Sequence, residues 1–180
     1  MLRVLLMTAL GVALTACKST SKKSVNAVAV NAVAANAVAG APTQLVINIH
    51  NVSSEQGQLL VMIHDNSADY HADLNISDPR AHYFAKKIVS PQKPNTPVVF
   101  DNLPAGRYAI NVIHDKDSDG ELDRMIFPFL GMPSEPYALS NNIYDHFSKG
   151  DFDDALVEIY SPSHQIDLNL STHLSKITGL

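Results

Sequence analysis

Short runs of alternating apolar and polar residues, separated by turn residues, constrain the fold of this chain most strongly. Residues 44–52 place Leu45, Ile47 and Ile49 on one face, because successive side chains of a strand point to opposite sides of a sheet. Similar runs recur to the end of the chain, and little of the sequence has helical spacing. The predicted strands cover residues 44–52, 58–64, 83–89, 98–100, 107–114, 155–160 and 165–170.

About seven short strands with turn signals between them predict an all-β domain, an antiparallel β-sandwich. Turn residues at 53–57 between the first two strands predict that these strands form an opening hairpin. Residues 103–110, Leu-Pro-Ala-Gly-Arg-Tyr-Ala-Ile, resemble the Leu-Pro-x-Gly-x-Tyr turn and strand of transthyretin-like sandwiches. This resemblance implies a transthyretin-like or immunoglobulin-like fold and carries no function.

The first sixteen residues have the layout of a signal peptide. Arg3 precedes an apolar run at residues 4–14, which ends on the small residues Thr15 and Ala16. The run is too short for a hydrocarbon core, which needs about 20 apolar residues in a helix, so a transmembrane anchor is the less favoured interpretation. We therefore expect residues 1–16 to be removed and the chain to be exported.

Cys17 is the only cysteine of the 180 residues, so the chain has no internal disulfide. Residues 14–17, Leu-Thr-Ala-Cys, resemble the lipobox of bacterial lipoproteins, in which the signal is cut before the cysteine and its thiol is acylated. The resemblance implies lipidation of Cys17, a lipid bilayer as partner, and a place in the bacterial cell envelope. Lys18 favours the outer membrane, with the domain facing the periplasm or the cell surface. A chance cysteine in an ordinary secretory signal is the alternative.

A repeated pentamer follows the cysteine, beginning at Asn26, Asn31 and Asn36. Its period of five matches neither a helix nor a strand, so no face is presented to a core. We interpret residues 17–43 as the lipidated cysteine and a flexible tether, and residues 44–180 as one domain of ordinary length. A short helix or a self-associating strand is the alternative, because alanine favours helix and valine favours sheet.

An acidic segment at residues 114–123 carries the strongest chemical signal. Counted from Asp115, carboxylates stand at positions 1, 3, 5 and 9, a glycine stands at position 6, and Glu121 at position 7 offers its backbone carbonyl. This is the ligand order of an EF-hand calcium loop. Position 12 holds Ile126 in place of a glutamate, and we expect Glu135 to supply the missing carboxylate. The predicted Ca²⁺ ligands are Asp115, Asp117, Asp119, Glu121, Asp123 and Glu135.

A solvated acidic turn between strands is the alternative to this calcium loop, because Asp, Ser and Gly are common turn residues. The segments flanking the loop are also expected to be strand and loop, where an EF-hand has helices. Four aspartates held so close together would repel one another without a cation. We therefore favour the metal site.

Several short motifs follow one another in a fixed order and approximate spacing, within a resemblance that covers about residues 45–170. The motif residues are His114–Asp115, Asp119–Asp123, Gly131–Tyr137, Ser140–Asn142 and Phe152–Ala155. They resemble the uncharacterised bacterial family catalogued as domain of unknown function 2141. Ala138, where the family commonly has glycine, and a longer insert at residues 144–149 depart from its pattern. The resemblance implies an exported β-rich domain and brings no established activity.

Other kinds of site have weaker support in the sequence. Net charge is −5 and the basic residues are scattered, which argues against a nucleic-acid partner. The histidines at 64, 71, 82 and 114 lack the spacing typical of zinc sites. A hydrolase would need a nucleophile such as Ser140, and the chain has no Gly-x-Ser-x-Gly elbow.

The sequence thus predicts a non-enzymatic envelope lipoprotein with a calcium-stabilised β-sandwich. Its role would be binding or structural, with an envelope protein or glycan as partner and no catalytic residue. The alternative is a calcium-stabilised hydrolase of envelope polymers or glycans, with Glu135 or His146 as general base.

Overall fold

A computed structural model of the chain describes residues 41–72, 74–127 and 130–179. The predicted signal, Cys17 and most of the predicted tether lie outside the described residues. Within these residues, four short helical segments are α1 (Ser67–His71), η1 (Ser140–Asn142), α2 (Phe152–Ala155) and α3 (His173–Thr178). The strands are β1 (Pro42–His50), β2 (Gln58–His64), β3 (Ala85–Val89), β4 (Thr96–Pro104), β5 (Gly106–Asp115), β6 (Tyr137–Leu139), β7 (Leu156–Ile159) and β8 (Ser163–Asn169).

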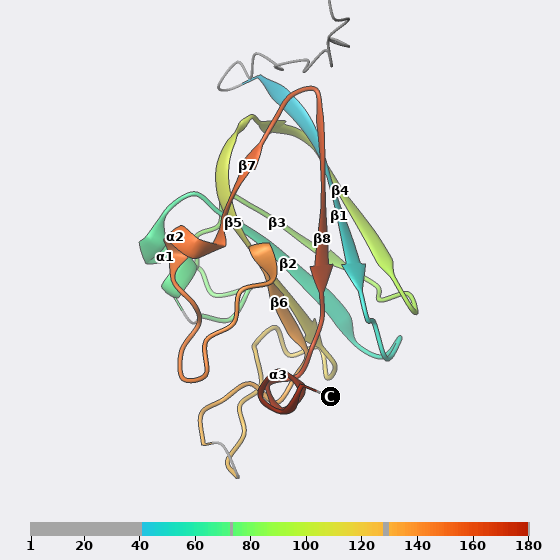
Figure 1. Ribbon diagram of the computed structural model, residues 1–180, viewed down its shortest axis with the longest axis vertical. Coiled ribbons are helices and arrows are strands. Elements are labelled where there is room, and N and C mark those ends of the chain that lie inside the picture. The colour runs from blue at the N-terminus through green and yellow to red at the C-terminus, as the bar shows by residue number, and fades with distance from the viewer. Residues whose placement is uncertain (1–40, 73, 128–129, 180) are drawn as a thin grey trace, which may run out of the picture. The chain divides into compact units, whose positions relative to one another are not determined.

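These strands form two sheets, so the predicted all-β sandwich is confirmed. One sheet has the order β4-β1-β8, and the other has the order β3-β2-β5-β6 with β7 also paired to β5. Figure 1 shows β8, β1 and β4 side by side, with β2, β3 and β5 in the second layer. Pairing is antiparallel except between β1 and β8, which are parallel. A parallel pair needs a long crossover, and here the rest of the domain provides it.

The predicted hairpin between the first two strands is wrong. β1 is flanked by β4 and β8, while β2 is flanked by β3 and β5 in the other sheet. Both strands are therefore interior strands, and neither has a free edge with which it could pair with the other. The turn residues at 53–57 predicted a change of direction correctly, but a turn signal does not specify which strand becomes the neighbour.

The main core lies between the two sheets. Leu45, Ile47 and Ile49 of β1 are fully buried there, as their alternation predicts. They belong to one cluster with the alternate residues Leu59 and Val61 of β2. Burial of such side chains away from water is the principal force that holds the two sheets together.

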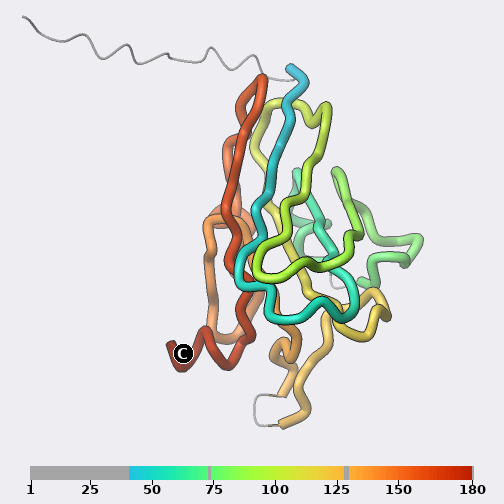
Figure 2. The backbone as a smooth tube through the Cα atoms, turned by 90° about the vertical axis from the view of Figure 1, so that its right-hand side faces the viewer, coloured from blue at the N-terminus to red at the C-terminus, as the bar shows by residue number. Residues whose placement is uncertain are grey.

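The five-stranded sheet is buried on both faces, which explains the continuous apolar run of β2. Leu59 belongs to the main core, whereas its neighbours Leu60 and Met62 pack with Ile76 in a second cluster. The segment that follows α1 covers this outer face, and Figure 2 shows it (green) on the side away from β8 (red). A strand covered on both faces reads as apolar throughout. This covered face also positions the acidic loop described below.

A tyrosine fixes the turn between β4 and β5. The Tyr108 hydroxyl donates to the carbonyl of Pro104 at 2.9 Å. A Cβ atom at Gly106 would lie 3.3 Å from the Tyr108 ring, so glycine leaves room for the ring to cross the turn. The Leu-Pro-x-Gly-x-Tyr pattern is thus a tyrosine corner, a device typical of sandwich folds.

Candidate metal centre

The acidic loop begins at Asp115, the last residue of β5, whose side chain is fully buried. Its Oδ1 accepts from the backbone amides of Ser118 and Asp119 at 2.7 and 3.2 Å. Its Oδ2 accepts from the Gly120 amide at 2.9 Å and from Nε2 of Gln58 at 2.8 Å. One carboxylate therefore accepts hydrogen bonds from three backbone amides and bends the chain around itself.

Gly120 allows the loop to approach the segment that follows α1. Its φ is +87°, and a Cβ atom there would lie 2.9 Å from Oδ1 of Asn75. Asn75 donates to the Asp119 carbonyl at 2.8 Å, and the Ile76 amide donates to the Gly120 carbonyl at 2.8 Å. Asn75 and Gln58 both support the loop, and the sequence offered no motif that would have found either of them.

Glu135 returns to the loop through the turn at residues 131–134. The Ser134 amide donates to the Asp123 carbonyl at 2.8 Å and holds the two arms together. Glu135 is only 5% exposed. Its Oε1 accepts from the Lys116 amide at 2.6 Å, and its Oε2 accepts from the Asp123 amide at 3.2 Å. The structure therefore places Glu135 against the acidic loop, where the coordination argument expects a carboxylate.

The acidic side chains fall into two overlapping groups that share Asp117. Ligand atoms of Asp115, Asp117 and Glu135 lie within 4.8 Å of one another, and those of Asp117, Asp119 and Asp123 do so as well. Calcium binds oxygens at about 2.3–2.6 Å, so ligands on opposite sides of one ion lie about 5 Å apart. Each group therefore has the dimensions of a calcium shell.

The remaining positions of the predicted loop lie at its edge. Glu121 was expected to offer its backbone carbonyl, and its exposed side chain accepts from Asn75 at 3.3 Å. Ile126, at position 12, is 86% exposed and offers no side-chain oxygen. The loop thus has the first part of an EF-hand ligand order, and a buried glutamate from the following turn lies beside it.

The electrostatics of the loop favour a cation. Burial raises the pKa of Glu135, as do the charges of Asp115 and Asp123, while its two backbone hydrogen bonds lower it. Desolvation raises the pKa of Asp117, and the neighbouring charges of Asp119 and Asp123 raise it further. A bound divalent ion would remove both the repulsion and the penalty of burying charge.

The residues considered for hydrolysis lie in three different environments. Ser140 is fully buried, accepts from the Ile110 amide at 2.9 Å, and donates to the Ala155 carbonyl. His146 is exposed, with its ring 5.0 Å from the ring of Tyr144. Both oxygens of Glu135 accept backbone amides, as described above. These environments differ from those of an activated nucleophile and its base.

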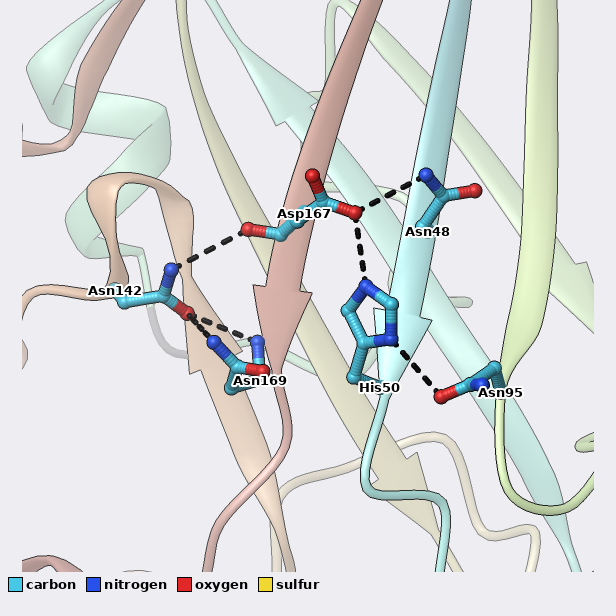
Figure 3. Close-up of polar contacts among 6 residues, drawn as sticks. All are labelled: Asn48, His50, Asn95, Asn142, Asp167 and Asn169. Carbon is cyan, nitrogen blue, oxygen red and sulfur yellow. Dashed lines mark hydrogen bonds and ion pairs between the residues drawn. The ribbon is translucent and has the colours of Figure 1, made fainter.

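The motif Ser140–Asn142 joins distant elements. Asn141 donates to the carbonyls of Asp154 and Leu156 at 2.8 and 3.1 Å. Asn142 donates to the Asp167 carbonyl at 3.3 Å and accepts from the Asn169 amide at 2.9 Å, as Figure 3 shows. The hydrogen bonds of this motif therefore hold the segment after β6 against the start of β7 and against β8.

A polar cluster that the sequence analysis missed lies on β1 and β8. His50 Nε2 contacts Asp167 Oδ1 at 2.8 Å and Nδ1 contacts Asn95 Oδ1 at 2.9 Å, while Asn48 donates to the same Asp167 oxygen at 3.1 Å (Figure 3). Hydrogen bonds to Asp167 and Asn95 raise the pKa of His50. Because both ring nitrogens have partners, we interpret the cluster as a fastening between strands.

Zinc has little support among the described residues. The groups of three or more potential metal ligands in the described part of the chain contain no histidine. His114 is buried and its Nε2 contacts the Gln56 carbonyl at 2.9 Å. His64 is also buried, and its ring packs against those of Tyr70 and Tyr83.

In the described ranges, no helix has the length and apolar character required to span a membrane.

A family model described as an uncharacterised protein conserved in bacteria, domain of unknown function 2141, matches residues 47–167. No curated protein and no solved structure matches the chain.

Proposed function

We propose a function from the site itself, because the family to which this chain belongs, the bacterial domain of unknown function 2141, is uncharacterised and suggests no activity. The chain would be an exported envelope lipoprotein whose β-sandwich is stabilised by calcium and serves a binding or structural role. The observation that carries the calcium proposal is the return of buried Glu135 to Asp115 and Asp117.

One calcium ion per chain fits this arrangement better than two. The two acidic groups share Asp117, and two divalent ions on one carboxylate would repel each other strongly. Asp117, Asp119 and Asp123 are exposed, and Asp117 and Asp119 each accept a backbone amide through one oxygen, which leaves the other oxygen of each for the ion. Asp115 already accepts four hydrogen bonds, so its main part is to shape the loop. Water and the Glu121 carbonyl would complete the six to eight oxygens that calcium prefers.

The proposed role of the ion is to rigidify a surface. The loop contacts the segment after α1 through Asn75 and Ile76, and Glu135 joins it to the strand that follows. A cation that neutralises the loop would hold these segments together over the outer face of the five-stranded sheet. An envelope protein or a glycan would then bind this ordered surface. The hydrolase alternative has less support, because Ser140 and Glu135 are engaged in backbone hydrogen bonds.

The lipoprotein part of the proposal rests on the sequence. The pattern Leu-Thr-Ala-Cys at residues 14–17 places an acylated Cys17 about 25 residues before β1, which begins at Pro42. A tether of that length would let the domain reach tens of ångströms from the bilayer if it is extended, at about 3.3 Å per residue. The envelope location and the bilayer partner follow from the same pattern.

Calorimetric titration of the full chain with calcium tests the metal site. We expect saturable binding of one ion with a Kd at or below about 1 mM, and a loss of about tenfold or more in affinity in Asp117→Asn. Asp153→Asn is the matched control, because Asp153 is an exposed aspartate on α2 outside the acidic groups. Equal affinity in Asp117→Asn and Asp153→Asn would refute the site.

A further inference from the structure

Three large apolar side chains are exposed in the hairpin that follows the acidic loop. Ile126, Phe127 and Leu130, which we call the apolar tip, are 86%, 86% and 77% exposed. Isolated exposed apolar residues are common in proteins, but a group gathered on one short turn indicates a contact with an apolar partner. The apolar tip is therefore a candidate contact surface.

A hydrogen-bonded neck presents this tip. The Met125 amide donates to the Met132 carbonyl at 2.8 Å, and the Gly131 amide donates to the Met125 carbonyl at 2.9 Å. The Arg124 side chain donates to the Gly131 carbonyl at 2.7 Å. Backbone groups that are paired within the protein can approach lipid without the penalty that unpaired polar groups incur. The neck can therefore come close to a bilayer at little cost.

The hairpin and the start of β1 lie at opposite ends of the sandwich, as Figure 1 shows. The start of β1 is beside the start of β5, because the Ala105 amide donates to the Ala41 carbonyl at 2.8 Å. The acidic loop and the hairpin follow the other end of β5. This strand has 10 residues, which corresponds to about 33 Å at about 3.3 Å per residue.

The length of chain before β1 brings a bilayer within reach of the tip. About 25 residues separate Cys17 from Pro42, and at about 3.3 Å each they span up to about 80 Å. This span exceeds the length of β5, so a domain anchored at Cys17 can turn its far end toward the same bilayer. Tethering also keeps the bilayer at a high effective concentration around the tip. This step rests on the lipidation of Cys17, which is part of the proposed function.

We propose that Ile126, Phe127 and Leu130 insert into the surface of a lipid bilayer, as a second attachment of the domain besides Cys17. A bilayer takes up protruding apolar side chains without a complementary pocket, to a depth of about 5–10 Å at the boundary between headgroups and acyl chains. The lipid on Cys17 already holds the protein at the membrane, so the effect of the tip is on orientation. The inserted tip turns the end of the sandwich that carries the acidic loop toward the headgroups.

Tryptophan fluorescence provides the test, because the natural chain has no tryptophan. Phe127→Trp places one reporter in the tip. Phe84→Trp places it at the other end of the sheet, where the Phe84 ring is 41% exposed and lies 4.8 Å from the ring of Tyr108 near the start of β5. Each full-length variant is reconstituted into phosphatidylcholine vesicles with and without bromine on the acyl chains. We expect bromine to quench the emission of Phe127→Trp and to leave that of Phe84→Trp unchanged.

Exposed apolar residues elsewhere provide a matched control for the tip. Ile126→Asn with Leu130→Asn, added to Phe127→Trp, should abolish the quenching because the tip loses its other two apolar side chains. Ile88→Asn with Leu174→Asn changes the same residue types on β3 and α3, where these residues are 50% and 51% exposed, and should leave the quenching intact. Equal quenching in the two sets, or no quenching in Phe127→Trp alone, would overturn the proposal.

Sedimentation of the vesicles separates this inference from the lipoprotein proposal. A chain that sediments through its lipid at Cys17 but shows no quenching in Phe127→Trp is a lipoprotein without an inserted tip. A chain that carries no lipid refutes the lipoprotein proposal, and an excess of brominated vesicles then tests the tip alone, where absent quenching overturns the insertion. A blue shift of Phe127→Trp emission that grows with protein concentration without vesicles would assign the tip to a second copy of the chain and would also overturn it.

Discussion

Glu135 accepts a 2.6 Å hydrogen bond from the backbone amide of Lys116, nineteen residues earlier in the chain. The other oxygen of Glu135 accepts the Asp123 amide, so one buried carboxylate joins the first and last parts of the acidic loop. This arrangement makes Glu135 both a fastening of the loop and a candidate ligand. These two roles of Glu135 can be separated by measuring the stability of the protein with and without calcium.

Glu135→Gln should lower the calcium-induced rise in melting temperature. The amide removes one negative charge from the site, so calcium binds less tightly, by about tenfold or about 1.4 kcal/mol. The variant also loses one acceptor for a backbone amide, so its stability without calcium should fall as well. Thermal scans with and without calcium separate these effects. An unchanged calcium response would remove Glu135 from the proposed ligands and would leave the aspartates in place.

Cys17→Ser should release the protein from the membrane fraction or leave the signal peptide uncut. A serine hydroxyl does not replace the thiol that the lipobox pattern predicts to be acylated. Detergent partitioning and mass spectrometry of both forms provide the measurement. A processed serine variant that stays in the membrane as firmly as the natural chain would contradict lipidation.

The fold was largely predictable from the sequence, because alternation records which residues face a core. β2 begins and ends where its apolar run predicts, and Leu45, Ile47 and Ile49 are buried together. β6 has only three residues, too few to show an alternation, and it was missed. The parallel pairing of β1 with β8 was not predicted, because it depends on contacts between the two ends of the domain.

The candidate site was predictable where its residues are neighbours in sequence. The acidic spacing indicated the loop, and the absence of a carboxylate at position 12 led to Glu135. Asn75 and Gln58, which hold the loop from other segments, carry no local signal. The cluster of His50 and Asp167 was hidden for a similar reason, since its residues meet only in the parallel register.

Ser140→Ala should destabilise the domain by about 1–3 kcal/mol, the cost of leaving buried polar groups without partners. The Ser140 hydroxyl serves the Ile110 amide and the Ala155 carbonyl, both in the interior. Urea unfolding measures the loss, with Ser163→Ala, at an exposed position, as the control. A change as small as that of Ser163→Ala would show that the motif is not a structural fastening.

The contact of His50 with Asp167 should make stability depend on pH. The pKa of His50 is raised above its ordinary 6.5, so its contribution is present in full below 6.5 and is lost as pH rises through the raised value. The pKa of Asp167 is lowered below its ordinary 3.8, so its contribution is present above 3.8 and is lost as pH falls through the lowered value. The contact therefore stabilises most between these limits.

Asp167→Asn isolates this effect. The hydrogen bond to Asp167 is the main cause of the raised His50 pKa, so removal of the carboxylate should return that pKa toward 6.5. An NMR titration of the His50 ring follows the change directly, and denaturant unfolding from pH 4 to 8 follows stability. A His50 titration that is the same in both proteins would contradict the assignment.

The most direct test of the calcium site is a crystal structure of the protein grown with calcium, with anomalous diffraction to identify the ion. We predict one calcium peak beside Asp117, bound at about 2.3–2.6 Å by oxygens of the aspartates and of Glu135. A peak elsewhere, or an acidic loop that binds only water at saturating calcium, would contradict the account.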